Sequence, residues 1–120
     1  MTTVLVVDDD PGVRFALTEV LSERGHRVIA ASSGQEALGL LEGVDVVVTD
    51  LAMPGMDGLE LVSRIAARAP ALPVILVTAH GSEHVVRTAT SRGVCSCIRK
   101  PFDIDEIARV VEQARSRPCS

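Results

Sequence analysis

Acidic side chains that could hold a metal ion follow two apolar runs that lie far apart in the sequence. Asp8, Asp9 and Asp10 come after the run TVLVV, and Asp50 comes after the run DVVVT. Neighbouring carboxylates in a partly buried cleft repel one another, which raises the pKa of at least one of them. A hard divalent cation relieves this repulsion, and Mg²⁺ prefers carboxylate, carbonyl and water oxygens. The acidic residues therefore predict a magnesium site if the fold brings them together.

A hydroxyl and an ammonium occur at corresponding places on two later runs. Thr78 ends the run PVILVT, and Lys100 follows the run VCSCI. A phosphoryl group in transfer carries negative charge on its equatorial oxygens, which need positive charge and hydrogen-bond donors. With Asp50 as the nucleophile, Thr78 and Lys100 would complete a site for phosphoryl transfer.

Short apolar runs alternate with segments of helical period along the whole chain. The runs predict β-strands at 3–7, 27–31, 45–49, 73–78 and 94–98. Apolar residues at three- and four-residue steps predict helices between them, the weakest of which is the segment 82–92. Ser33, Asp57 and Asp103, each followed by Glu three residues later, predict helix starts, and Gly25, Gly43 and Gly93 predict helix ends.

This alternation predicts an α/β fold with a five-stranded parallel sheet covered by helices on both faces. A flavodoxin-like, doubly wound (βα)5 arrangement with strand order 2-1-3-4-5 fits the pattern. Functional residues in such sheets gather outside the carboxyl ends of the strands, where the strand order reverses. Here that place lies between the first and third strands, so Asp8, Asp9 and Asp50 are expected to meet there.

Length and composition indicate one compact unit. We expect a single domain over residues 1–120, with a core of about 3–115 and no effector domain in this chain, because 120 residues at 47% hydrophobic content suit one core. No apolar run approaches the roughly 20 residues that cross a bilayer, which predicts a cytoplasmic protein without a membrane partner. The net charge is −4 and the 12 basic residues are scattered, so direct nucleic-acid binding is not expected.

The motifs VVDDDP, DLAMPGMDG, VTAHG and RKPF resemble those of the response regulator receiver domains of two-component systems, in the same order and spacing. The resemblance covers residues 1 to about 115 and implies that Asp50 is the phosphorylation site. It further implies that Asp9 binds Mg²⁺ directly with Asp50, that Asp8 acts through water and that Ala52 contributes its backbone carbonyl. Thr78, Ala79 and Lys100 would bind the phosphoryl group, and the Lys100–Pro101 peptide bond would be cis.

The resemblance also implies the partners and the output. The phosphoryl donor would be a histidine kinase or a phosphotransfer protein, and the fourth helix, fifth strand and fifth helix would form a face that controls an effector protein or a fused output domain. A homodimer through that face is also compatible with the resemblance. Receiver domains usually carry an aromatic residue where this chain has Cys97. We therefore expect a smaller structural change at this position than a rotating ring would give.

Three other functions are compatible with parts of the pattern. A haloacid-dehalogenase-type phosphatase also uses an Asp nucleophile, Mg²⁺ and Lys, but Asp50 is followed by Leu51 and Ala52 where that class has a second acid. A flavin carrier shares the topology, but the first loop is acidic where a phosphate cradle offers amides and hydroxyls. A pseudo-receiver that binds proteins without phosphorylation is the third, and Cys97 keeps it open. In the leading hypothesis the protein is no enzyme for an external substrate and catalyses only its own phosphorylation and dephosphorylation.

Overall fold

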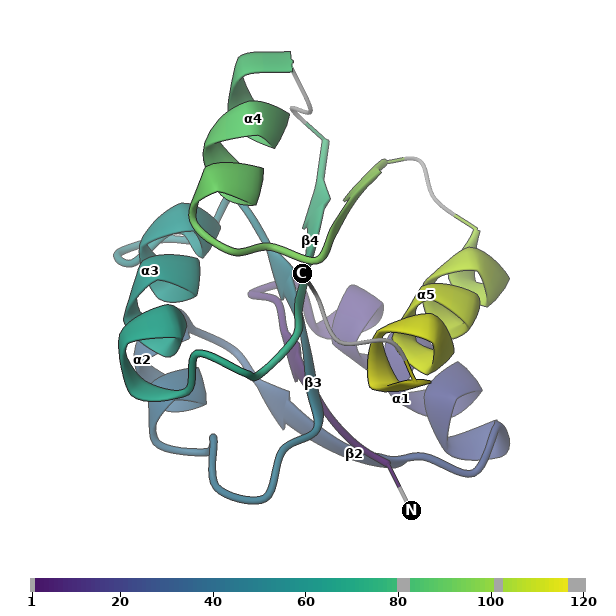
Figure 1. Cartoon of the computed structure of the whole chain (residues 1–120). Helices are drawn as coiled ribbons and strands as arrows, with labels where there is room; N and C mark the ends of the chain where they lie inside the picture. The colour runs from purple at the N-terminus through teal and green to yellow at the C-terminus, as the bar shows by residue number, and fades with distance from the viewer. Residues whose placement is uncertain (1, 80–82, 101–102, 117–120) are drawn as a thin grey trace.

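The fold was analysed in a computed structural model, which describes residues 2–79, 83–100 and 103–116 of the chain. Strands and helices alternate throughout (Figure 1). Their bounds are β1 Thr3–Val7, α1 Pro11–Glu23, β2 Arg27–Ala31, α2 Gly34–Leu38, β3 Val46–Asp50, α3 Gly58–Arg68, β4 Val74–Thr78, α4 Glu83–Ser91, β5 Ser96–Arg99 and α5 Ile104–Ser116. None of the helices in these ranges is long and apolar enough to cross a bilayer.

The five strands form one parallel sheet in the order β2-β1-β3-β4-β5, as predicted. The first strand lies between the second and third, with Val4 opposite Val28 on one side and Val46 on the other. The chain therefore winds outward in both directions from β1 and β3. The carboxyl ends of these two central strands are adjacent, which is where the predicted acidic site belongs.

Helices cover both faces of the sheet (Figure 1): α1 and α5 lie on one face, and α2, α3 and α4 on the other. Each face has its own hydrophobic core. Leu21 and Ile107 pack on the first, and Leu61 and Ile65 on the second. Strands β3 and β4 are buried along their entire length, because β-branched and aliphatic side chains point into both cores.

Helix starts follow the predicted chemistry. Ser33 Oγ accepts the Glu36 amide at 3.1 Å, and Asp57 Oδ1 accepts the Glu60 amide at 2.8 Å, so both residues cap their helices. The third predicted cap differs in detail, because Asp103 Oδ1 accepts the amide of Asp105. Gly25 and Gly93 follow the ends of their helices in the left-handed conformation, as predicted. The prediction for Gly43 was wrong, because α2 ends at Leu38 with Gly39 as its cap, and Gly43 adopts the left-handed conformation in the loop before β3.

Two predicted strands are displaced along the sequence. The third runs over Val46–Asp50 and so includes the carboxylate that was expected to follow it. Asp45 lies outside this strand, and its side chain accepts the Thr3 amide at 2.8 Å, at the other edge of the sheet where β1 begins. The fifth begins at Ser96, since the Val94 amide is bonded to the Ala89 carbonyl at the end of α4.

Candidate functional site

Three carboxylates meet at the carboxyl edge of the sheet, as the sequence predicted. Asp8 and Asp9 follow β1, and Asp50 is the last residue of the adjacent β3. One ligand oxygen from each lies within 4.8 Å of the others. Asp8 and Asp50 are buried, at 3% and 7% exposure, whereas Asp9 is exposed and leaves the cluster open to solvent. This all-oxygen set could hold a hard cation.

Asp8 carries the electrostatic cost of this arrangement. Burial raises the pKa of its carboxyl above the ordinary value of 3.8, and the nearby charges of Asp50 and Asp9 raise it further. The Asp10 amide, which donates to Asp8 Oδ1 at 2.9 Å, and the ammonium of Lys100 act in the opposite direction. Because burial of the charged carboxyl is the main cause of the raised pKa, a bound cation would stabilise the ionised form.

Asp50 is held rigidly at the end of its strand. Its Oδ1 accepts the amide of Leu51 at 2.8 Å, and the Leu51 amide also donates to the Val77 carbonyl of β4 at 3.1 Å. The Lys100 ammonium lies 3.6 Å from the same Oδ1. Lys100 is itself positioned by the sheet, because its amide donates to the Thr78 carbonyl at 2.8 Å. The structure thus brings together the predicted nucleophile and the predicted cation.

Thr78 and Ala79 lie at the same edge of the sheet. Thr78 is the last residue of β4, is 1% exposed, and stands opposite Arg99 in the β4–β5 register. Ala79 follows it and is exposed. Ala52 is also exposed, in the loop that leaves β3 two residues after Asp50. The predicted cis bond between Lys100 and Pro101 involves a residue outside the described part of the chain.

Cys97 lies away from this edge, in the second position of β5. It is half-buried and packs against the core on the α2–α3–α4 face of the sheet, opposite Leu76 of β4. Its thiol is free, and burial raises the thiol pKa above its ordinary value, partly offset by the charge of Arg99. A thiol held in its protonated form is a poor nucleophile. Cys97 therefore serves as a packing residue at this position.

The structural roles of three residues near the site were not predicted from the sequence. Asp10 caps α1, since its Oδ1 accepts the Gly12 amide at 2.8 Å. Arg14 of α1 donates from Nη1 to the backbone carbonyl of Asp8 at 2.7 Å. Gly58, the first residue of α3, packs against the Asp50 carbonyl oxygen and the Leu51 Cα. The Asp-Pro-Gly sequence is a recognisable helix start, whereas the roles of Arg14 and Gly58 depend on tertiary packing.

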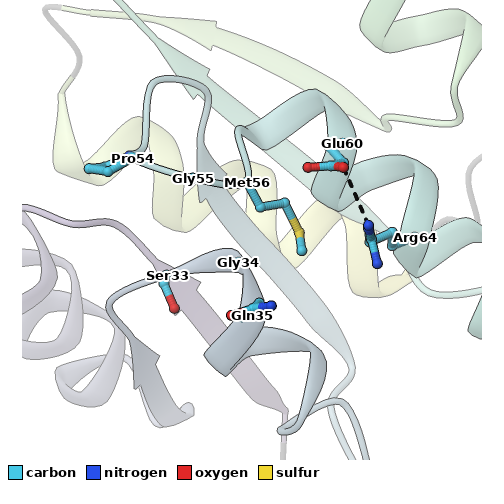
Figure 2. Close-up of a pocket in the computed structure, with 8 residues that line it drawn as sticks. All are labelled: Ser33, Gly34, Gln35, Pro54, Gly55, Met56, Glu60 and Arg64. Atoms are coloured by element: carbon cyan, nitrogen blue, oxygen red, sulfur yellow. Dashed lines mark hydrogen bonds and ion pairs between the residues drawn. The ribbon is translucent and has the colours of Figure 1, made fainter.

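A cavity of about 340 Å³ lies beside the loop that follows Asp50 (Figure 2). The loop residues Pro54, Gly55 and Met56 form one wall, and the other lining residues come from α2 and α3 with their preceding turn: Ser33, Gly34, Gln35, Glu60 and Arg64. Figure 2 shows the ion pair between Arg64 and Glu60, which are 3.4 Å apart. Glu60 and Arg64 are one turn apart on the exposed face of α3, an ordinary surface pairing. The cavity is distinct from the acidic cluster.

Comparison with known proteins shows which family model the sequence matches. The model of the family described as the response regulator receiver domain matches residues 4–112. The transcriptional regulatory protein GlrR of Escherichia coli (strain K12) is 42% identical over 113 residues, covering 92% of this chain and 26% of that protein. The chain thus spans about a quarter of the length of this relative.

Two further relatives match along nearly their whole length. Sporulation initiation phosphotransferase F of Bacillus subtilis (strain 168) is 36% identical over 112 residues, covering 92% of this chain and 90% of that protein. The solved structure of the receiver domain of the Francisella response regulator 1452 has a TM-score of 0.92 and 31% sequence identity, covering 98% of each chain. The chain therefore shares its fold with a solved receiver domain, and it covers nearly the whole length of both of these proteins.

Proposed function

Because this chain belongs to the response regulator receiver domain family, we propose that Asp50 is its phosphorylation site and that phosphorylation there switches the domain. The observation that carries this proposal is the position of Asp50. Its carboxylate is buried at the end of a rigid strand, beside two further carboxylates and 3.6 Å from the Lys100 ammonium. Of the three clustered carboxylates, Asp50 has the closest ion pair with Lys100, which can hold its oxygen for attack.

The acidic cluster fits a divalent cation, and we assign it to Mg²⁺. Asp9, Asp50 and the backbone carbonyl of Ala52 would be the protein ligands, with Asp8 acting through water. The uncompensated charge of buried Asp8 supports this assignment, since the pKa of its carboxyl is raised mainly by burial. When bound, Mg²⁺ neutralises the oxygens of the transferring phosphoryl group.

In the proposed reaction an Asp50 carboxylate oxygen attacks the phosphorus of a phosphohistidine or a small acyl phosphate. A bond forms between Asp50 and phosphorus, and the bond from phosphorus to the donor breaks, leaving an acyl phosphate on Asp50. Lys100 supplies positive charge to the transferring group, and the Thr78 hydroxyl donates to one of its oxygens. Attack by water on the same phosphorus later releases inorganic phosphate and restores the carboxylate. The protein acts in this way on its own side chain only.

The proposed partners follow from this reaction. A histidine kinase or a phosphotransfer protein would supply the phosphoryl group in the cytoplasm, and the name of the Bacillus relative describes that protein as a phosphotransferase. The face made by α4, β5 and α5 would control an effector protein or an output domain, and it could also form a homodimer. Thr78 and Ala79 precede α4 in the sequence, and they would couple the phosphorylation site to this face.

The test is phosphorylation by acetyl phosphate with Mg²⁺, followed by intact mass measurement. The wild type is expected to gain one phosphoryl group, and Asp50→Asn is expected to gain none. Asp57→Asn is a matched control, because it changes an exposed carboxylate in the same loop while Asn preserves the helix cap. Labelling of Asp50→Asn to the same extent as the wild type would disprove the assignment of Asp50. No labelling of the wild type would favour the phosphorylation-independent pseudo-receiver.

A further inference from the structure

Arg14 lies next to the acidic cluster, but it forms a hydrogen bond to a backbone carbonyl there. Its guanidinium Nη1 donates to the backbone carbonyl of Asp8 at 2.7 Å, in a partly buried position. A hydrogen bond from a charged donor is about twice as strong as a neutral one. The contact joins the second turn of α1 to the end of β1, six residues earlier in the chain.

Because Arg14 donates to the Asp8 carbonyl, it leaves the Asp8 carboxylate oxygens available to a metal ion. An arginine bonded to the carboxylate oxygens would compete with a metal ion for them, whereas one bonded to the carbonyl fixes the residue without occupying a ligand atom. The Lys100 ammonium, in contrast, lies 3.6 Å from a carboxylate oxygen of the cluster, Asp50 Oδ1. Arg14 therefore acts on the backbone of this turn, whereas Lys100 pairs with a carboxylate.

The remaining polar groups of the turn depend on the position of the same backbone. The Asp8 amide donates to the Ala31 carbonyl of β2 at 3.1 Å, which holds the turn on its sheet side. Asp8 Oδ1 accepts the Asp10 amide at 2.9 Å, and Asp10 Oδ1 accepts the Gly12 amide at 2.8 Å. On the helix side, the turn is held by the hydrogen bond from Arg14 to the Asp8 carbonyl. Together these bonds keep Asp8 and Asp9 directed toward Asp50 despite their mutual repulsion.

We propose that Arg14 is a positioning residue for the metal site, which holds the Asp8–Asp10 turn in the conformation that binds Mg²⁺ and thereby sets the affinity for the ion. The proposal rests on the proposed function, since it assigns Mg²⁺ to the acidic cluster. It makes a prediction opposite in sign to that of simple electrostatics. Removing a positive charge near an acidic site should tighten cation binding, whereas removing a positioning group should weaken it.

The experiment measures Mg²⁺ affinity by calorimetry for the wild type, Arg14→Met, Arg14→Lys and Arg27→Met. Arg14→Met keeps most of the stem and loses the donor, and about tenfold weaker Mg²⁺ binding is expected, as for the loss of other groups that orient metal ligands. Arg14→Lys retains a donor and should recover most of the affinity. Arg27→Met makes the same charge change on an exposed residue at the opposite end of the sheet, and should bind Mg²⁺ at least as tightly as the wild type.

A second readout needs no metal. In the absence of Mg²⁺, rapid amide exchange measured by NMR should become about tenfold faster at Asp10 in Arg14→Met, as expected for loss of a hydrogen bond to a charged group. Leu76 in the buried strand β4 serves as the internal control. Unchanged or tighter Mg²⁺ binding by Arg14→Met, with unchanged exchange at Asp10, would overturn the proposal. If the wild type itself bound no Mg²⁺ and gained no phosphoryl group, the proposed function would fall as well, so the two failures are distinguishable.

Discussion

Replacing Gly58 with alanine should displace the backbone of the proposed phosphorylation site, although Gly58 contributes no side chain to the site. A methyl group at this position would overlap the Asp50 carbonyl oxygen and lie 2.8 Å from Leu51 Cα and 3.0 Å from Leu76 Cδ1. The first two are backbone atoms and cannot rotate away. The Gly58 amide is moreover bonded to the Leu51 carbonyl at 2.8 Å, so the start of α3 cannot withdraw without losing this bond.

The expected magnitude follows from two opposing effects. Overpacking against fixed atoms costs about 1–3 kcal/mol, while alanine in place of glycine gains at most about 1 kcal/mol inside a helix and less at its first residue. We expect a net loss of about 2 kcal/mol in the free energy of unfolding. Because the displaced atoms belong to Asp50 and Leu51, the rate of phosphorylation by acetyl phosphate should fall as well.

Gly34→Ala is a matched control. Gly34 also occupies the first position of a helix after its cap, so the change in helix propensity is comparable. A methyl group there would lie 2.8 Å from Met56 Sδ and 3.2 Å from Met56 Cβ and Cγ. In Figure 2 the Met56 side chain extends from the loop toward α2. This flexible side chain can shift, so the loss should stay below about 1 kcal/mol.

Urea unfolding followed by far-UV circular dichroism measures both variants, since the chain has no Trp or Tyr for fluorescence. Gly58→Ala should unfold at a clearly lower urea concentration than Gly34→Ala. The prediction would be refuted if both variants were as stable as the wild type and Gly58→Ala were phosphorylated at the wild-type rate. The close packing of Gly58 against Asp50 and Leu51 would then not maintain the site.

Three further predictions concern individual residues of the site. The pKa of Asp8 is raised in the folded protein, so ionisation of Asp8 lowers the free energy of unfolding at any pH above this raised pKa. This destabilisation disappears as the pH falls through the raised pKa toward the ordinary value of 3.8. Without Mg²⁺, Asp8→Asn should therefore be more stable than the wild type at neutral pH, and the two should become equally stable in acid. Urea unfolding midpoints measured across this pH range would show the difference. Lower stability of Asp8→Asn at neutral pH would contradict the prediction. Lys100→Met should reduce the phosphorylation rate by about a hundredfold. It should not weaken Mg²⁺ binding, because the ammonium faces Asp50 and repels the ion. An equal loss of phosphorylation rate and of Mg²⁺ affinity would argue for disruption of the site. With a phosphoryl mimic bound, NMR should show only a small shift of Cys97, since this packing residue has no ring to rotate, and a large displacement there would contradict the limited role given to it.

Much of the fold could be predicted because local chemistry and topology agree. The run ending in Asp50 is apolar on both faces, which requires a central strand, and Ser33 and Asp57 cap their helices in the predicted way. Strand limits were predicted less well. Asp45 and Val94 stand at the starts of the third and fifth predicted strands, yet their polar groups bond to Thr3 and Ala89, contacts that periodicity does not reveal.

The clustering of the three carboxylates could be predicted for a similar reason. Topology alone brings Asp8, Asp9 and Asp50 together, because the ends of β1 and β3 are adjacent. The support beneath these carboxylates was not predictable. Arg14 is one of several arginines in the sequence, and its bond to the Asp8 carbonyl depends on how α1 packs beside β1. Gly58 reads as an ordinary residue at a helix start until the closeness of the Asp50 backbone is known.

The central claim is that Asp50 itself carries the phosphoryl group, and locating the adduct tests it most directly. After incubation with acetyl phosphate and Mg²⁺, borohydride reduces an aspartyl phosphate to homoserine, which peptide mass spectrometry can place in the sequence. The account predicts homoserine at position 50 and unmodified aspartate at Asp8, Asp9 and Asp57. Homoserine at one of those residues, with position 50 unchanged, would contradict it.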